Sequence, residues 1–113
     1  MSTSTITEFL EARIAEDEAQ AYNVLVFRMI PGTGMPGNQA IPDRVLAECA
    51  AKRAILAEHE MAIRSDGIRR QEGCVMCNYN RDYGWEETGP CKTLRALAAV
   101  YASHPDYRQE WAL

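Results

Sequence analysis

The sequence predicts a mainly α-helical single domain in which three helices are joined through a cysteine-bearing loop. A chain of 113 residues has the usual length of one domain, so we assign residues 1–113 to a single unit. Apolar residues recur at helical spacing in three separate segments, and each segment follows a motif or a proline that favours the start of a helix. Three of the four cysteines lie between the second segment and the third.

The first helix is expected over residues 5–22. Thr5 and Glu8 have the spacing of a capping box, in which each side chain satisfies a free backbone N–H of the first turn. Ile6, Phe9 and Ile14 then follow at helical spacing and define one apolar face. Much of the remaining face is acidic, so we expect a surface helix that packs through a single apolar stripe.

The segment 24–41 separates the first two helices and has two parts. Residues 24–30, VLVFRMI, are rich in β-branched and aromatic side chains, which favours a short strand, although an extension of the first helix also fits. Residues 31–42, PGTGMPGNQAIP, hold three glycines and three prolines. This composition ends regular structure and predicts a loop.

The second helix is expected over residues 42–63. Pro42 suits the first helical position, because its missing N–H would have no intrahelical partner there. One face of this helix carries an apolar stripe, formed by Val45, Cys49, Leu56 and Ile63. Residues 64–91 then form the cysteine-bearing loop, which we expect to be polar and irregular as far as Gly73.

The third helix is expected over residues 92–103, after Pro90. Its apolar side consists of Leu94, Leu97, Ala98 and Tyr101. The tail, residues 104–113, is expected to make a last short helical turn from Pro105. Tyr107 and Trp111 are four residues apart in this turn, so both side chains are expected to dock on the same surface.

Composition and charge exclude several classes of function. The formal net charge is −4 and the pI is near 5.1, which argues against a mainly electrostatic binder of nucleic acid or membranes. The first twenty residues have no positive region followed by an apolar core, unlike a signal peptide. The longest apolar run is interrupted by Arg28 and is much shorter than the roughly 20 residues of a membrane span. We therefore expect a cytoplasmic protein.

The cysteines are best interpreted as metal ligands. In a reducing cytoplasm, clustered cysteines serve more often as ligands or redox groups than as disulfides. Cys74 and Cys77 form a C-x-x-C turn, which directs two thiolates at one ion. Cys91 lies at the start of the third helix, where the helix dipole favours a thiolate. We expect one structural zinc ion per chain.

A tetrahedral zinc site needs a fourth ligand, and His59 is favoured. His104 is thirteen residues after Cys91, and an intervening helix would separate the two by about 19 Å. Cys49 and His59 would be about 15 Å apart along the second helix, so only one of them can join the site. His59 is nearer to the helix end that leads into the cysteine loop, whereas Cys49 is expected in the core. His104 and Cys49 remain the alternatives.

Several motifs resemble a family of short uncharacterised proteins from actinobacteria and their bacteriophages. The motifs are EFLEARIAEDE, DRVLAECAAKRAILAEH, the C-x-x-C turn with a following P-C-x-T-L-R, and YASHPDYRQEW. The resemblance implies that His59, Cys74, Cys77 and Cys91 belong to a shared pattern, which also includes His104. Residues 24–39 depart from it, because this stretch is longer and more apolar. The family carries no known activity, so the resemblance implies an architecture and a setting but no mechanism.

The leading functional hypothesis is a zinc-stabilised helical protein that binds another protein and is not an enzyme. A set of three cysteines and one histidine leaves no position on zinc for a substrate, and the H-x-E…P-C-x-x-C signature of zinc deaminases is not present around His59 and Cys74. A partner protein, which we expect to be a host protein, or a second copy of the chain would contact apolar and aromatic residues, for which the candidates are Val24, Leu25, Phe27, Met29, Ile30, Tyr79, Tyr83 and Trp85.

Two alternatives remain open at this stage. The cysteine loop combines four arginines with aromatic side chains, a pattern that suits nucleic-acid binding, but acidic residues among them cancel the charge. The second alternative is an iron–sulfur or thiol redox sensor in which Cys49 joins the other three cysteines. Metal content distinguishes the leading hypothesis from the redox sensor, and a salt-dependent shift of single-stranded nucleic acid would favour the first alternative.

Overall fold

The computed structural model describes residues 5–28, 40–65, 70–77, 79–80, 84–85 and 89–113. Its helices are α1 (Ile6–Arg28), α2 (Ala40–Glu58) and α3 (Lys92–Ala99), followed by the short 3-10 helix η1 (Gln109–Trp111). Strands β1 (Met61–Ser65) and β2 (Arg70–Cys74) form one antiparallel pair, and β3 (Tyr79–Asn80) and β4 (Gly84–Trp85) form another. The predicted fold class, mainly helical with three helices and a final short turn, is confirmed.

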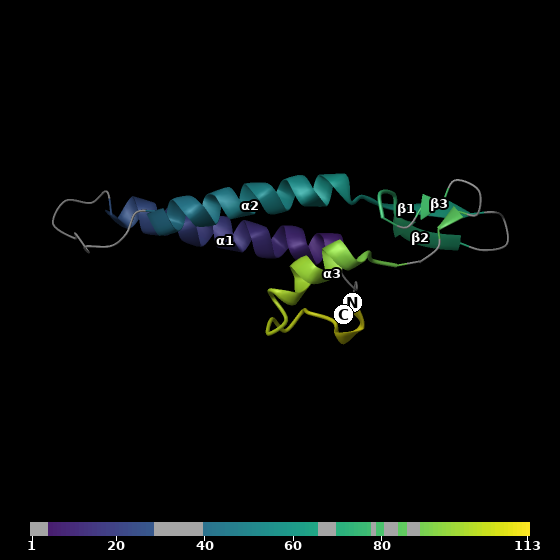
Figure 1. Ribbon diagram of the computed structural model, residues 1–113. Helices are drawn as coiled ribbons and strands as arrows, with labels where there is room; N and C mark the ends of the chain where they lie inside the picture. The colour runs from purple at the N-terminus through teal and green to yellow at the C-terminus, as the bar shows by residue number, and fades with distance from the viewer. Residues whose placement is uncertain (1–4, 29–39, 66–69, 78, 81–83, 86–88) are drawn as a thin grey trace.

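Helices α1 and α2 lie side by side as an antiparallel hairpin, and α3 packs against α1 (Figure 1). The strand pairs lie beyond the C-terminal end of α2, at one end of this hairpin. At the start of α1 the Thr5 half of the predicted capping box is formed, because the Thr5 hydroxyl accepts a hydrogen bond from the Glu8 backbone N–H at 3.1 Å. The same hydroxyl donates to the Glu8 carboxylate at 3.1 Å, which holds this carboxylate at the N-terminal end of the helix.

The short strand predicted for residues 24–30 is not formed between residues 24 and 28. This part continues α1 to Arg28, six residues beyond the predicted helix end. Ala21 is buried and Leu25, one helical turn later, is half-buried, so the packed face of α1 continues past the expected boundary. Packing of this face overrides the strand preference of the β-branched side chains, which is weak and depends on context. Residues 29–39, which hold most of the predicted glycine- and proline-rich loop, lie outside the described residues, and the last three residues of that predicted loop, 40–42, belong to α2 instead.

Helix α2 differs from the prediction at both ends. It begins at Ala40, so Pro42 occupies its first turn, where a residue without an N–H loses no intrahelical hydrogen bond. It ends at Glu58 rather than at residue 63, because Met61 begins β1. Ile63, which had been placed on the helical stripe, pairs with Glu72 across the strands. The residues from Arg64 to Gly73, predicted as an irregular loop, belong partly to β1 and β2.

Helix α3 ends at Ala99, four residues earlier than predicted. After it, the Val100 and Tyr101 N–H groups donate to the carbonyls of Leu97 and Ala98 at 3.3 and 2.9 Å. These bonds join residues three apart, so the chain tightens into turns instead of continuing the α-helix. The Tyr101 hydroxyl then donates to the Asp17 carboxylate at 2.7 Å and accepts from Lys52 Nζ at 3.0 Å, which ties the end of α3 to both long helices.

The tail docks on α1 through an aromatic cluster centred on Phe9. The ring of Trp111 lies 5.1 Å from that of Phe9, centroid to centroid, and the ring of Tyr107 lies 6.1 Å from it. Tyr107 and Trp111 also contact each other at 5.7 Å, in an edge-to-face arrangement that aromatic pairs favour. The two side chains therefore share one surface as expected, but not through one helical turn: η1 begins at Gln109 rather than at Pro105, and Arg108 before it is extended, with φ = −105° and ψ = 133°.

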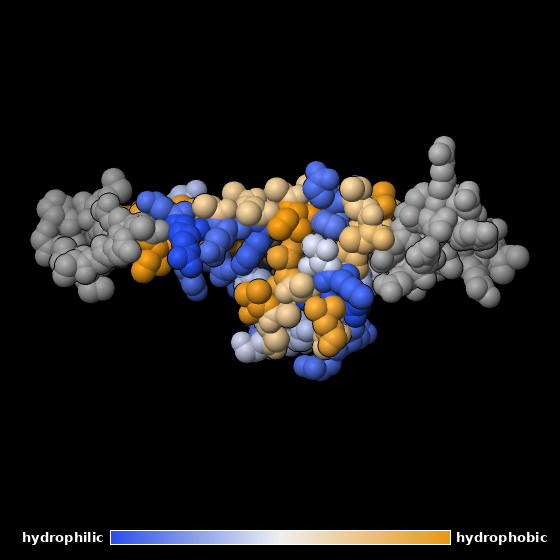
Figure 2. Space-filling view, viewed as in Figure 1, coloured by the Kyte–Doolittle hydropathy of each residue, from blue (hydrophilic) through white to orange (hydrophobic). Residues whose placement is uncertain are grey.

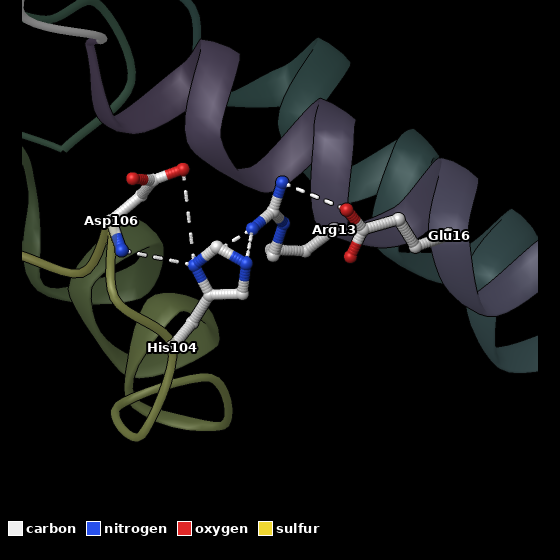
Figure 3. A network of polar contacts seen from close by, with 4 residues as sticks. All are labelled: Arg13, Glu16, His104 and Asp106. Atoms are coloured by element: carbon white, nitrogen blue, oxygen red, sulfur yellow. Dashed lines mark hydrogen bonds and ion pairs between the residues drawn. The ribbon is translucent and has the colours of Figure 1, made fainter.

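A polar network beside this cluster holds the tail to α1 (Figure 3). A terminal nitrogen of Arg13 contacts the His104 ring, with 2.8 Å to Nδ1, and the other forms an ion pair with Glu16 at 3.0 Å. The Asp106 backbone N–H donates to His104 Nδ1 at 3.0 Å. Arg13 is 8% exposed although it is charged, and its Nε has no hydrogen-bond partner. His104 therefore supplies part of the polar environment that makes burial of Arg13 tolerable.

Replacing His104 with alanine is expected to lower the free energy of unfolding by about 1–3 kcal/mol. The reason is that the substitution leaves a second polar group of buried Arg13 without its contact. Urea denaturation followed by circular dichroism measures this effect. Arg44→Ala is the control, because the Arg44 side chain is 81% exposed in its ion pair with Glu48, and such pairs contribute about 0.3–0.5 kcal/mol. Equal effects of the two substitutions would contradict a structural role for His104.

The hydrophobic core lies where α1, α2, α3 and the tail meet. Leu10 and Ile14 of α1 and Leu94 of α3 are fully buried in it. Cys74 and Cys91 are also fully buried and belong to the same cluster of side chains, so the core is continuous with the cysteine-bearing region. Among the described residues, no helix has both the length and the apolar character that crossing a membrane requires.

Candidate metal centre

Four separate positions of the chain supply the side chains of the candidate metal centre. His59 directly follows α2, and its backbone N–H still donates to the carbonyls of Ile55 and Leu56 at 3.1 and 3.2 Å. Cys74 is the last residue of β2, and Cys77 follows it after a turn. Cys91 is the N-cap residue of α3. We call these four residues the metal cluster.

In the metal cluster, the imidazole nitrogen lies close to all three sulfurs. His59 Nδ1 lies 3.2 Å from Cys77 Sγ, 3.5 Å from Cys74 Sγ and 3.8 Å from Cys91 Sγ. All four donor atoms lie within 4.8 Å of one another. Zinc bound tetrahedrally to sulfur at about 2.3 Å and to nitrogen at about 2.0 Å separates its ligand atoms by roughly 3.5–3.8 Å. The observed nitrogen–sulfur distances fall close to these values.

The strand pairing explains how Cys74 reaches His59. Met61, two residues after His59, pairs with Cys74 in the β1–β2 register. The Val75 N–H donates to the Glu60 carbonyl at 3.1 Å, which extends this contact past the end of the strands. The sequence gives little signal for these strands, because Met61, Ala62 and Ile63 are all apolar and do not alternate with polar residues.

Cys91 is brought to the other side of the cluster through a second backbone contact. Gly89 forms a parallel bridge with Gly73, the residue before Cys74. Gly89 has φ = 83°, in the left-handed region that glycine adopts without the steric cost that a side chain would bring. After this bend the chain passes through Pro90 to Cys91, which is fully buried and lies near Cys74 and Cys77.

Burial and charge in the cluster favour a bound cation. The pKa of the Cys91 thiol is raised to about 11, mainly by burial; the nearby thiols of Cys74 and Cys77 contribute to this increase, and the Leu94 backbone N–H opposes it. Without a cation, two or three thiolates in this space would be destabilised by desolvation and by mutual repulsion. A divalent ion offsets both costs, because a coordinating thiol is bound in its deprotonated form.

The other two candidate ligands lie elsewhere. Cys49 is 1% exposed between α1 and α2, with its Sγ 3.9 Å from the Ile14 carbonyl oxygen. Burial raises its pKa, and the carboxylates of Asp17 and Glu18 add to this increase, so this thiol has the character of an unreactive core residue. His104 lies against Arg13 and Phe9. The structure therefore brings together His59 and the three clustered cysteines, and it places Cys49 and His104 outside the cluster.

The predicted partner-binding residues are described only in part. Val24 is 42% exposed and Leu25 is half-buried, both in α1. The backbones of Tyr79 and Trp85 pair with each other as β3 and β4. The remaining positions are outside the described residues or are described by backbone alone: Phe27, Met29, Ile30 and Tyr83. Three exposed apolar residues near the same end of the hairpin were not predicted, namely Tyr22, Val26 and Ile41.

Comparison with known proteins gives one match. No curated protein and no solved structure matches the chain. A family of unknown function, DUF6221, matches residues 3–113 and so spans the helical hairpin, the metal cluster and the tail. The chain therefore belongs to this family of unknown function (DUF6221).

Proposed function

We propose that the protein binds one structural zinc ion through His59, Cys74, Cys77 and Cys91. The observation that carries this proposal is the convergence of one imidazole nitrogen and three sulfurs within 4.8 Å, from four positions of the chain. Zinc prefers this combination of sulfur and nitrogen donors at tetrahedral spacing. Harder cations such as Mg²⁺ and Ca²⁺ prefer oxygen donors, which this set does not contain.

The ion is proposed to be structural because the donor set is complete. Four protein ligands fill a tetrahedral site, whereas a catalytic zinc keeps one position for water or substrate. The ligands connect the end of α2, the end of β2 and the start of α3. A metal at this point would fix the strands to the helices. The function we propose is accordingly non-enzymatic.

Elemental mass spectrometry on protein purified without a histidine tag tests the metal proposal. The expected result is one zinc per chain, with loss of helical circular dichroism when a strong chelator removes the ion. The control is Cys49→Ala, because Cys49 is a buried thiol outside the cluster. This variant is expected to retain its zinc. Protein that is folded and free of metal would contradict the proposal, and iron with visible absorbance would favour a redox cofactor instead.

We further propose that the protein acts by binding another protein through the end of the helical hairpin that lies far from the metal cluster. Tyr22, Val26 and Ile41 are 57%, 60% and 61% exposed there. Figure 2 shows apolar surface in this region, next to the grey residues. A groove of about 510 Å³ lies between α1 and α2 nearby, lined by residues that include Ala21, Val24 and Val45. Clustered apolar surface of this kind is typical of protein contact sites.

Site-specific photo-crosslinking in the cell tests the interaction surface. A photoreactive residue at position 26 is expected to form a discrete crosslinked species with a second protein, and one at position 54 is the matched control. Ala54 is exposed, lies within α2 and does not line the groove. The proposal predicts that Val26→Asp weakens this association while the melting temperature stays the same. Crosslinks of equal yield from both positions would contradict it.

A further inference from the structure

The three thiols of the metal cluster differ in their access to solvent. Cys74 and Cys91 are fully buried and belong to the hydrophobic core. Cys77 is exposed, and it follows two exposed residues, Val75 and Met76, at the tip of the turn. A small oxidant dissolved in water therefore reaches the sulfur of Cys77 before it reaches the others. Susceptibility of a thiolate to oxidation depends on this access as well as on its charge state.

Cys77 also has a second thiol in position to complete an oxidation. Its Sγ lies within 4.8 Å of Cys74 Sγ, and a disulfide bond has a sulfur–sulfur distance of about 2.05 Å. Cys74 is the last residue of β2 and Cys77 lies in the turn that directly follows, so an approach of up to about 3 Å needs movement of this turn alone. The sulfur of Cys91 also lies within 4.8 Å, but Cys91 is held at the first turn of α3, where its carbonyl accepts the Arg95 N–H at 3.0 Å.

We propose that Cys77 is an oxidation site for hydroperoxides, and that its oxidation, completed by Cys74, expels the zinc ion. This inference rests on the zinc site proposed above. In this proposal the exposed turn that carries Cys77 acts as a sensor of peroxide, a role that a purely structural zinc site would not have.

The reaction balances with hydrogen peroxide as the oxidant. The Cys77 thiolate attacks one peroxide oxygen, the O–O bond breaks, and the products are a sulfenic acid on Cys77 and one hydroxide ion. The Cys74 thiolate then attacks the sulfur of Cys77, forms the disulfide and releases a second hydroxide ion. The two sulfurs lose one electron each, and the peroxide gains both.

Loss of these two donors removes the zinc. The disulfide leaves His59 and Cys91 as the remaining ligands, and two ligands do not complete a tetrahedral site. The zinc ion is therefore bound more weakly and is transferred to any chelator in the solution. The oxidised chain then lacks the metal that joins its strands to its helices, so it is expected to lose helical circular dichroism, as the chelator-treated chain does.

The test is a peroxide titration of the zinc-loaded full-length protein in the presence of a zinc-sensitive dye. The expected result is complete release of zinc, with one ion freed for each hydrogen peroxide consumed. Mass spectrometry of proteolytic fragments is expected to show a Cys74–Cys77 disulfide, and dithiothreitol with added zinc is expected to restore the starting state. A disulfide that joins Cys77 to Cys91, or zinc release without any disulfide, would overturn the assignment.

Two variants sharpen the test. Cys77→His keeps four zinc-binding side chains but removes the exposed thiol, so it is expected to hold zinc through the same peroxide treatment. Cys49→Ala, which removes a thiol outside the cluster, is expected to release zinc as the unaltered protein does. Zinc release from Cys77→His at the unaltered rate would overturn the inference. Metal content is measured first: a chain without zinc defeats the metal proposal, whereas a zinc-loaded chain that resists peroxide defeats only this inference.

Discussion

Replacing Cys91 with alanine is expected to leave the protein largely unfolded, even in buffer that contains zinc. Cys91 is fully buried, caps α3 and contributes one of the four donors of the metal cluster. Structural zinc sites supply of order 10 kcal/mol of apparent folding free energy, and the total stability of a small domain is only about 5–15 kcal/mol. Losing one ligand therefore removes a contribution comparable to the whole stability of the fold.

Far-ultraviolet circular dichroism and metal content, measured on the same sample, check this prediction. The expected signals are a strong loss of helicity and less than one zinc per chain. Cys49→Ala is the matched control, since it truncates another fully buried cysteine. It should behave as an ordinary small core truncation, with a cost of about 1 kcal/mol. If Cys91→Ala kept native helicity without zinc, the metal would not be part of the fold.

Replacing Phe9 with alanine is expected to lower the free energy of unfolding by about 3–5 kcal/mol. Phe9 is 3% exposed, and its ring contacts those of Tyr101, His104, Tyr107 and Trp111. The substitution removes a large buried side chain and leaves a cavity that the surrounding rings fill only in part. It also removes the surface on which the tail docks, so the tail is expected to separate from α1 before the helical hairpin unfolds.

Urea denaturation gives the size of this effect, and near-ultraviolet circular dichroism of Trp111 reports on the tail. Tyr22→Ala serves as the control, because Tyr22 is an aromatic residue of the same helix that is 57% exposed. Its substitution should change stability by no more than about 0.5 kcal/mol. A double-mutant cycle between Phe9 and Trp111 should give a coupling of about 0.5–1.5 kcal/mol. Additive effects would show that the two rings are energetically independent.

The parts of the fold that were predictable depend on contacts near in sequence. The Thr5–Glu8 cap sets the start of α1 within three residues, and Pro90 followed by Cys91 sets the start of α3. The start of each of these helices therefore depends only on a few residues that are close together in the sequence.

The boundaries that were wrong depend on partners distant in sequence. Nothing within residues 24–28 shows that the face of α1 stays packed along α2, so their β-branched side chains favour a strand, and the helix extension found here is only the alternative. The end of α2 was misplaced because Ile63 fits both a helical period and the alternation of a strand. Pairing with residues 70–74 decides between the two, and that pairing cannot be read from either segment alone.

The four donors of the candidate site were identifiable for a chemical reason. Three cysteines in a short interval need a nitrogen or a fourth sulfur, and the chain has only two histidines and one further cysteine to offer. The geometric argument favoured His59 because of its position near the end of α2, and it directly follows that helix. The strands that carry Cys74 to it were not foreseen. The identity of the four ligands can thus be predicted from the number and type of ligand side chains in the sequence. The strand pairing that brings these side chains together cannot.

The contact between Phe9 and Trp111 also has a consequence for synthesis on the ribosome. Translation proceeds at about 5–20 residues per second, so segments near the start of a chain emerge seconds before those that follow. Helices α1 and α2 are neighbours in sequence and can associate as soon as both have emerged. The Phe9 face of α1, in contrast, stays exposed until the tail that covers it has been made. A ribosome-bound nascent chain that ends before Tyr107 should therefore present this apolar face to chaperones, and the complete chain should not.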